Sequence, residues 1–265
     1  MPKRTRRTDL SALVEKYQGL SIVSEIEHNL LSANRSKHNI EDLVLNDLYD
    51  EKNYCLEKYQ GLKDSLKDDG FLVPLIIVES KENKFEIING VKRYLLAKEL
   101  GYKEMPCVLA ELSIERKLAY IIQNICSEGD CPLVKTKAFL TLEEQYGYSD
   151  MDISKISSLS LNQVRNIKRL SSLPEFLKEG VRDFTLSYSE ARALLNLPET
   201  KQHELYDQIK MGMLSVRDLE KIKRQHIGRL KKRKVTLKNK RVTITFASAE
   251  EAKKFYPMIE KEFSD

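Results

Sequence analysis

The sequence predicts an α+β protein that is predominantly helical and has three folded parts. Apolar, β-branched runs alternate with helical segments over residues 61–110, which indicates a small α/β domain. Helical periodicity dominates from Ile114 to about residue 230, and alternation of polar and apolar residues returns over residues 234–246. The 265 residues are 41% hydrophobic and 32% charged, which suits two or three modest domains in a surface-rich protein.

The first folded part is a predicted α/β domain over residues 21–112, preceded by a flexible basic arm over residues 1–20. Its expected elements are a helix, two strands, a helix and a strand, at residues 61–69, 71–78, 84–89, 91–100 and 105–110. Residues 71–78 form an apolar run with Pro74 near its start, which is typical of a buried strand. Asn89-Gly90 ends the next strand, so the second helix begins at a glycine-bearing turn.

The second part, residues 113–222, is a predicted helical DNA-binding domain. Its helices are expected between Gly, Pro or Ser-rich breaks, at about residues 113–126, 133–146, 150–157, 160–171, 175–180, 187–196, 200–210 and 215–230. A basic linker is expected at residues 223–233. Residues 234–265 predict a small ββα dimerisation domain, with a hairpin around Asn239-Lys240 and a helix that begins at Ser248. About thirty residues bury too little surface to fold alone, so we expect this domain to pair with a second copy.

A helix-turn-helix is predicted at about residues 150–171. Ile153 and Ile156 face inward on its first helix, Ser157-Ser158-Leu159 forms the turn, and Val164 and Ile167 are apolar positions of its second helix. The polar face of the second helix carries hydroxyl, amide and cationic groups, from Ser160, Asn162, Gln163, Arg165, Asn166, Lys168 and Arg169.

These seven residues are predicted to contact double-stranded DNA. Amides can bond adenine edges in a bidentate manner, and cations can bond guanine or phosphate. No acid occurs between Ile153 and Leu173, although the chain has 40 acids. An ordinary helical hairpin without a DNA function is the alternative.

Positive charge is concentrated in two segments. Lys3–Arg7 contains four cations, and residues 221–241 contain eleven cations and no acid. The other 30 of the 45 cations are outnumbered by the 40 acids, so the remaining surface is acidic. Basic patches on an acidic body favour nucleic acid as a partner, and a merely solvated linker is the alternative for residues 221–241.

The order of several motifs resembles the ParB family of plasmid and chromosome partition proteins, from about residue 56 to the end. Residues 62–78 are similar to the first box of the family. Asn89-Gly-Val-Lys-Arg93 occupies the place of its Gly-Glu-Arg-Arg box, and Gln123-Asn124 falls where its third box has Glu-Asn. Leu173-Pro174 and residues 186–195 are similar to stretches that follow its reading helix.

The resemblance implies an N-terminal domain that binds CTP and Mg²⁺ and uses them to close a clamp on DNA. The residues implied for the nucleotide are Gly90, Lys92, Arg93 and Asn124, with Asn124 also implied as a ligand of Mg²⁺. The family's two box glutamates are replaced by Val91 and Gln123, and an arginine of its third box is replaced by Ser127. These losses weaken metal and γ-phosphate contacts, so we expect no catalytic residues and at most weak CTP hydrolysis. A vestigial pocket that only supports the fold is the alternative.

These features predict a site-specific DNA-binding protein of the partition type. It would bind a centromere-like site as a homodimer and act with a ParA-type ATPase in plasmid or chromosome segregation, gated by CTP. Chromosomal members often have Arg after Ser160, where this chain has Leu161, which favours a different site, such as that of a plasmid. One alternative is a helix-turn-helix transcriptional regulator of ParB-like fold without a segregation role. An enzyme is a further alternative, but no paired carboxylates or Ser/His/Asp set support it.

We expect no membrane partner and a cytoplasmic location on the nucleoid or on a plasmid. No run of eighteen apolar residues occurs, and Met1–Arg7 lacks the apolar stretch of a secretory signal. Cys126 and Cys131 have no nearby His and are interpreted as incidental reduced thiols rather than a metal or redox pair. Basic arms like Lys3–Arg7 contact the ATPase in the family, and solubilising charge or a membrane-binding helix are the alternatives.

Overall fold

The computed structural model describes residues 35–80, 83–127, 129–231, 234–238, 241–245 and 253. The predicted basic arm over residues 1–20 lies outside the described residues, as does the predicted closing helix after Ser248 except for Lys253. The chain divides into two compact units, Met1–Tyr188 and Ser189–Asp265.

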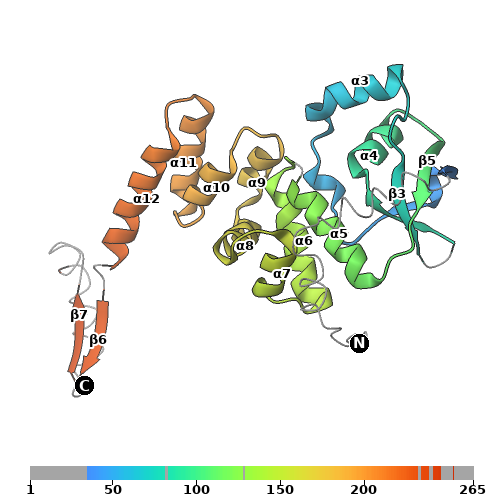
Figure 1. The fold of residues 1–265 in the computed structure, drawn as a ribbon. Coiled ribbons are helices and arrows are strands. Elements are labelled where there is room, and N and C mark those ends of the chain that lie inside the picture. Colours follow the sequence, from blue (N-terminus) through green and yellow to red (C-terminus); the bar gives the residue numbers. More distant parts are fainter. Residues whose placement is uncertain are drawn as a thin grey trace. The chain divides into compact units, whose positions relative to one another are not determined.

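A five-stranded mixed sheet lies in the first unit (Figure 1). Its strands, in spatial order, are β1 (Arg35–Asn39), β5 (Glu104–Leu109), β3 (Leu75–Glu79), β4 (Phe85–Asn89) and β2 (Leu43–Leu45). β1 runs antiparallel to β5 and β3 antiparallel to β4, whereas β3 is parallel to β5 and β2 is parallel to β4. β3 is the central strand, and all its residues from Leu75 to Val78 are buried, which confirms the buried strand predicted from its apolar run.

The central strand begins at Leu75, so the predicted start at Phe71 is wrong. Leu72 and Val73 are exposed, and Pro74 has no N–H to donate to a neighbouring strand. The carbonyls of residues 73 and 74 instead accept hydrogen bonds from Arg93, at 2.5 and 2.8 Å. The backbone before β3 therefore binds a side chain of the following helix rather than another strand.

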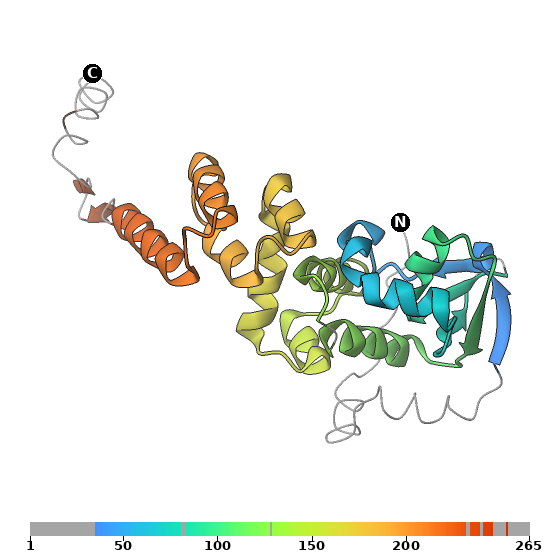
Figure 2. The ribbon, with the colours of Figure 1, turned by 90° about the horizontal axis from the view of Figure 1, so that it is seen from above.

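Strands β1 and β2 are absent from the prediction. β1 reads Arg-Ser-Lys-His-Asn, has no apolar residue and is mostly exposed. In Figure 2 it forms the outer edge of the sheet, where it pairs with β5. An edge strand with solvated side chains has no alternation of apolar residues to reveal it, and β2 is only three residues long.

Within the described residues, the α/β domain has the two α-helices α3 (Gln60–Asp68) and α4 (Val91–Glu99), close to their predicted bounds. α4 packs against α3 and β3. Short 3-10 helices precede them, η1 (Ile40–Asp42), η2 (Glu51–Asn53) and η3 (Leu56–Tyr59). The helix that follows the sheet, α5 (Ile114–Ser127), packs against β4 and against later helices, so it connects the sheet with the helical domain.

The helices predicted after residue 113 are confirmed. Those that begin within the first unit are α6 (Pro132–Tyr146), α7 (Asp150–Ser157), α8 (Leu161–Lys168), η4 (Arg169–Ser172), α9 (Glu175–Arg182) and α10 (Tyr188–Leu194). The second unit contains α11 (Glu199–Lys210), α12 (Val216–Lys231), β6 (Lys234–Lys238) and β7 (Arg241–Thr245). β6 and β7 are antiparallel, with Lys238 opposite Arg241, which confirms the predicted hairpin.

Helix α12 continues to Lys231, so the described part of the expected basic linker, residues 223–231, is helical. Leu219 is fully buried, and Lys223 Nζ donates a hydrogen bond of 3.1 Å to the carbonyl of Arg192. These contacts hold the first half of α12 within its unit. Within the described residues, no helix combines the length and the apolar character needed to cross a bilayer.

Candidate nucleotide pocket and DNA-reading helix

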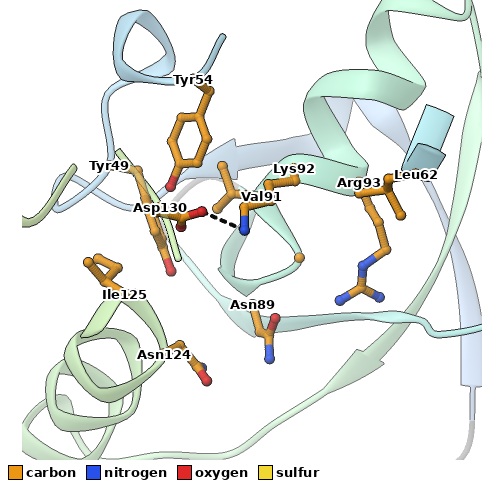
Figure 3. Close-up of a pocket in the computed structure, with 11 residues that line it drawn as sticks. Tyr49, Tyr54, Leu62, Asn89, Val91, Lys92, Arg93, Asn124, Ile125 and Asp130 are labelled. Carbon is orange, nitrogen blue, oxygen red and sulfur yellow. Dashed lines mark ion pairs between the residues drawn. The ribbon is translucent and has the colours of Figure 1, made fainter. Parts of the chain in front are cut away.

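A pocket lies where β4 passes into α4, opposite the end of α5 (Figure 3). The four residues implied for a nucleotide, Gly90, Lys92, Arg93 and Asn124, all line it. Tyr49, Tyr54 and Asp130 also line it and are absent from the prediction. The turn, the helix start and Asn124 are therefore brought together by the fold, although more than thirty residues separate Gly90 from Asn124 along the chain.

Gly90 shapes the pocket at the start of α4. Its φ of +97° lies in the left-handed region, and an added Cβ would be 2.4 Å from Leu75 Cδ2. Gly90 is the N-cap of α4 and provides no side-chain cap, and the first turn of the helix has no acid. The first N–H groups of an α-helix have no intrahelical acceptor, so this helix start suits an anion.

Asn124 lines the pocket and has a polar atom without a partner. The residue is 6% exposed, and its Nδ2 has no hydrogen-bond partner among the described residues. The backbone beside it is held, since Ser127 Oγ donates a hydrogen bond of 3.0 Å to the Asn124 carbonyl. A buried amide without a partner is costly, so this atom fits a pocket built for a polar ligand.

Both cations implied for phosphates already have protein partners. Lys92 Nζ lies 2.5 Å from Asp130 Oδ1, and the Asp130 side chain is only 3% exposed. Figure 3 shows Lys92 directed to Asp130, while Arg93 lies on the other side of the pocket. There the Arg93 guanidinium donates to the carbonyls of Val73 and Pro74.

Among the described residues, the carboxylates lost from the family's boxes are not replaced by a pair. Val91 is buried in the pocket wall, and Gln123 and Ser127 are not among the lining residues. Within the described part of the chain, Asp130 is the one carboxylate that lines the pocket. Asp130 follows Asn124 by six residues and belongs to no motif, so no local signal identified it.

The predicted helix-turn-helix consists of α7 and α8, each begun by a capping box. Ser149 caps α7 with Asp152, and Ser160 caps α8 with Gln163. Ser158 makes the turn with a φ of +58°. α8 packs against α6 and α7, and Thr136 Oγ1 donates a hydrogen bond of 3.0 Å to the carbonyl of Ile167. The inward residues Ile153, Ile156, Val164 and Ile167 are all buried, as predicted.

The predicted DNA-binding residues differ in how available their side chains are. Ser160, Asn162, Gln163, Arg165 and Arg169 are exposed, whereas Asn166 and Lys168 are partly buried. Gln163 Oε1 accepts a hydrogen bond of 2.8 Å from the backbone N–H of Ser160, so one group of this amide serves the cap. The capping role of Gln163 is a structural contribution that the amide-rich pattern alone did not reveal.

Asp150, at the start of α7, binds two cations of α8. Arg165 Nε is 3.1 Å from Asp150 Oδ2, and Lys168 Nζ is 2.7 Å from Asp150 Oδ1 and 2.6 Å from Glu143 Oε2. The hydrogen bond from Lys168, with a further one from Arg165, lowers the pKa of Asp150. Burial disfavours the charged form of Lys168, but its hydrogen bonds to Asp150 and Glu143 outweigh this effect and raise its pKa.

The four cysteine thiols are free, and burial makes three of them poorly reactive. Burial raises the pKa of Cys107 to about 12 and that of Cys126 to about 11. Burial also raises the pKa of Cys131. Thiols stay protonated near neutral pH under these conditions, which makes them weak nucleophiles and weak metal ligands.

The fold and the two sites define a class of protein in which an α/β domain with a pocket at a helix N-terminus precedes a helix-turn-helix domain. Two family descriptions match the chain in this order, the ParB N-terminal domain over residues 25–125 and the ParB HTH domain over residues 130–227. The chain belongs to the ParB family. The resemblance inferred from its motifs is confirmed.

The chain matches part of the length of individual relatives. The probable chromosome-partitioning protein ParB of Neisseria meningitidis is 32% identical over 166 residues, which are 62% of this chain and 58% of the relative. The probable chromosome 1-partitioning protein ParB of Deinococcus radiodurans is 30% identical over 174 residues, 65% of this chain and 60% of the relative. The chain therefore matches less than two thirds of either protein.

A solved structure is also similar to this chain. It is the C-terminally truncated chromosome-partitioning protein ParB from Caulobacter crescentus, complexed to the centromeric parS site. It is 24% identical, the match covers 72% of this chain and 99% of that chain, and the TM-score is 0.44.

Proposed function

We propose that this protein binds a centromere-like DNA site as a homodimer and acts with a ParA-type ATPase in plasmid or chromosome segregation. The helix-turn-helix is the observation that carries the proposal. Asn162 and Arg165 are exposed on α8, and Arg169 is exposed directly after it, at the start of η4. The apolar face of α8 is buried against α6 and α7. A rigid helix with exposed amide and guanidinium groups suits the major groove.

The proposed homodimer is supported by the small size and the composition of the C-terminal part. Within the described residues, β6 and β7 pair with each other and with no further strand, and an isolated hairpin is marginally stable in water. A second copy of residues 234–265 would provide the missing buried surface. The eleven cations of residues 221–241 would add affinity for any DNA, and this part of the affinity would fall steeply with salt.

The pocket is proposed to bind a nucleoside triphosphate, which the family membership makes CTP. Phosphates would lie at the N-terminus of α4, where Gly90 leaves the backbone accessible. The unsatisfied amide of Asn124 would contact the nucleotide or Mg²⁺, and Lys92 would bind phosphate. Because the described residues give the pocket one carboxylate, we expect weak, Mg²⁺-dependent binding with negligible turnover. The nucleotide would then act as a gating ligand rather than a substrate.

Selection of DNA from a random duplex library by the purified full-length protein tests the DNA proposal. We expect one palindromic sequence to be enriched, because a two-fold symmetric dimer presents two reading helices. The Arg165→Ala variant is the control and should enrich that sequence poorly. Failure to enrich any sequence would contradict site-specific binding.

Plasmid retention in cells separates segregation from transcriptional regulation. A test plasmid that carries the selected site, this gene and the gene of the proposed ParA-type ATPase should be retained without selection. Retention should be lost when either the site or the ATPase gene is removed. Equal loss of all these plasmids, with repression of a promoter next to the site, would favour the transcriptional regulator.

A further inference from the structure

The two ends of helix α8 are held by different parts of the helical domain. At its first end, Ser154 Oγ of α7 donates a hydrogen bond of 2.6 Å to the carbonyl of Leu159 in the turn, and Ser160 caps the helix. At its second end, Thr136 Oγ1 of α6 donates a hydrogen bond of 3.0 Å to the carbonyl of Ile167. The end of α8 is therefore bound by a helix that lies outside the helix-turn-helix.

The contact at the second end joins a buried side chain to the backbone of α8. Thr136 is 4% exposed, and Ile167 is 7% exposed. Ile167 lies in the last turn of α8, where the carbonyls of an α-helix depend on partners from outside the helix. Because water does not readily replace a hydrogen bond to a buried carbonyl, this bond restricts where the end of α8 can lie.

A neighbouring contact between α6 and α8 constrains the helix less. Lys168 Nζ lies 2.6 Å from Glu143 Oε2, but the Glu143 side chain is 47% exposed. Glu143 follows Thr136 by seven residues, so the two lie on the same face of α6, about two turns apart. An ion pair between two flexible side chains near the surface permits movement of the backbone, whereas Thr136 binds the backbone itself.

The orientation of α8 matters because Asn162 and Arg165 are exposed on it. A side chain pairs with a base edge only when its helix enters the major groove at a suitable depth and angle, and the two held ends of α8 set that angle. We propose that Thr136 is a positioning residue for DNA reading, which fixes the orientation of α8 through the carbonyl of Ile167. The inference rests on the proposed DNA-binding function. Since Thr136 is buried, it acts through α8 and not through a contact with DNA.

Fluorescence anisotropy of the full-length protein on two duplexes tests this role. One duplex has the sequence that the wild type selects, and the other is a scrambled duplex of the same length. The readout is the Kd for the scrambled duplex divided by the Kd for the selected duplex. Thr136→Val removes the donor at nearly the same side-chain shape and should lower this ratio by about three- to tenfold. Binding to the scrambled duplex, which depends on cations and phosphates, should change by less than about twofold.

Three further variants separate positioning from general support of the fold. Thr136→Ser retains the hydroxyl and should keep most of the wild-type ratio. Thr136→Ala removes the donor without placing a methyl group against the carbonyl, and its ratio should fall as in Thr136→Val. Thr141→Val is the matched control, because Thr141 is another buried threonine of α6 and has no hydrogen bond to α8 among the described residues. Thermal denaturation checks that each variant is folded at the temperature of the binding assay.

A wild-type ratio in both Thr136→Val and Thr136→Ala would overturn the inference. The Thr136 hydroxyl would then only serve α6, in which the carbonyl of Pro132 lies 3.1 Å from it. An equal fall of the ratio in Thr141→Val would also overturn it, since the loss would then follow from weaker packing of α6. If the wild type bound both duplexes alike, site-specific binding itself would be refuted, and that failure appears before any variant is measured.

Discussion

Replacing Arg165 and Lys168 separately should distinguish DNA reading from fold stability on one helix. The Lys168 side chain is 14% exposed and links α8 to Glu143 of α6 and Asp150 of α7, at 2.6 and 2.7 Å. The Arg165 side chain is 58% exposed and has one ion pair with Asp150, at 3.1 Å. Lys168 therefore joins three helices, whereas Arg165 projects from the surface.

The expected magnitudes follow from these exposures. A hydrogen bond to a charged group contributes about 1.5–3 kcal/mol when buried, but the two acids at Lys168 are 47% and 25% exposed, and water compensates much of the loss. Lys168→Met should lower the free energy of unfolding by about 1–2 kcal/mol, or the Tm by about 2–8 °C. Arg165→Ala should change it by less than about 1 kcal/mol.

For DNA binding, the Arg165 variant should have the larger effect and the Lys168 variant the smaller one. Arg165→Ala should weaken binding to the selected site by about 1–3 kcal/mol, or about 5–150-fold in Kd, with little change on random DNA. Lys168→Met should weaken it by less than about threefold, since its ammonium is largely enclosed by acids. Fluorescence anisotropy well below the lower Tm measures both values, and Lys201→Met, at an exposed cation of α11, is the control.

One result would refute this reasoning. If Lys168→Met melted like the wild type and lost as much specific affinity as Arg165→Ala, Lys168 would be a DNA contact and its ion pairs would be unimportant for stability. Equal losses of Arg165→Ala on selected and random DNA would instead assign Arg165 to phosphate contacts.

Three other predictions concern the turn, the dimer and the acid response. Gly90→Ala should lower the free energy of unfolding in urea by about 2–4 kcal/mol, and Gly70→Ala should lower it by only about 1–2 kcal/mol. Both glycines have a positive φ, but of the two only Gly90 lacks room for a Cβ. Equal losses would contradict the crowding at Gly90. Removal of residues 234–265 should leave a monomer by light scattering, and a persistent dimer would place the interface elsewhere. The lowered pKa of Asp150 contributes stability that is present above the unfolded value of about 3.9 and is lost as the pH falls through the lower folded value. Asp150→Asn should therefore flatten the dependence of unfolding free energy on pH between about 5 and 2, and an unaltered slope would assign the acid response to other groups.

The parts of the fold that the sequence predicted correctly are those set by local chemistry. The break at Asn89-Gly90 places a helix start beside a strand end, and a glycine with positive φ is what the turn requires. Apolar spacing and the break at residues 157–159 defined α7 and α8 in the same way. The resemblance to the family's motifs predicted that Asn124 lies at the same site as Gly90, although no periodic pattern in the sequence relates these two residues.

Partners contributed by other elements could not be predicted in this way. The stretch from Ile153 to Leu173 has no acid, which suggested an uncompensated basic face. In the fold, however, Asp150 and Glu143 meet Lys168 from neighbouring helices. Asp130 meets Lys92 across the pocket for the same reason. A count of charges along the chain does not report which acids tertiary packing brings to a cation.

The ion pair between Arg165 and Asp150 has a consequence for tolerance to changes in a DNA site. On a duplex whose base offers no acceptor to Arg165, the guanidinium can return to Asp150 instead of remaining unsatisfied. The loss of binding free energy for a wrong base at that position is then limited to the difference in free energy between a base contact and this ion pair. A centromere read in this way would tolerate sequence drift at one base while the rest of the reading helix continues to define it.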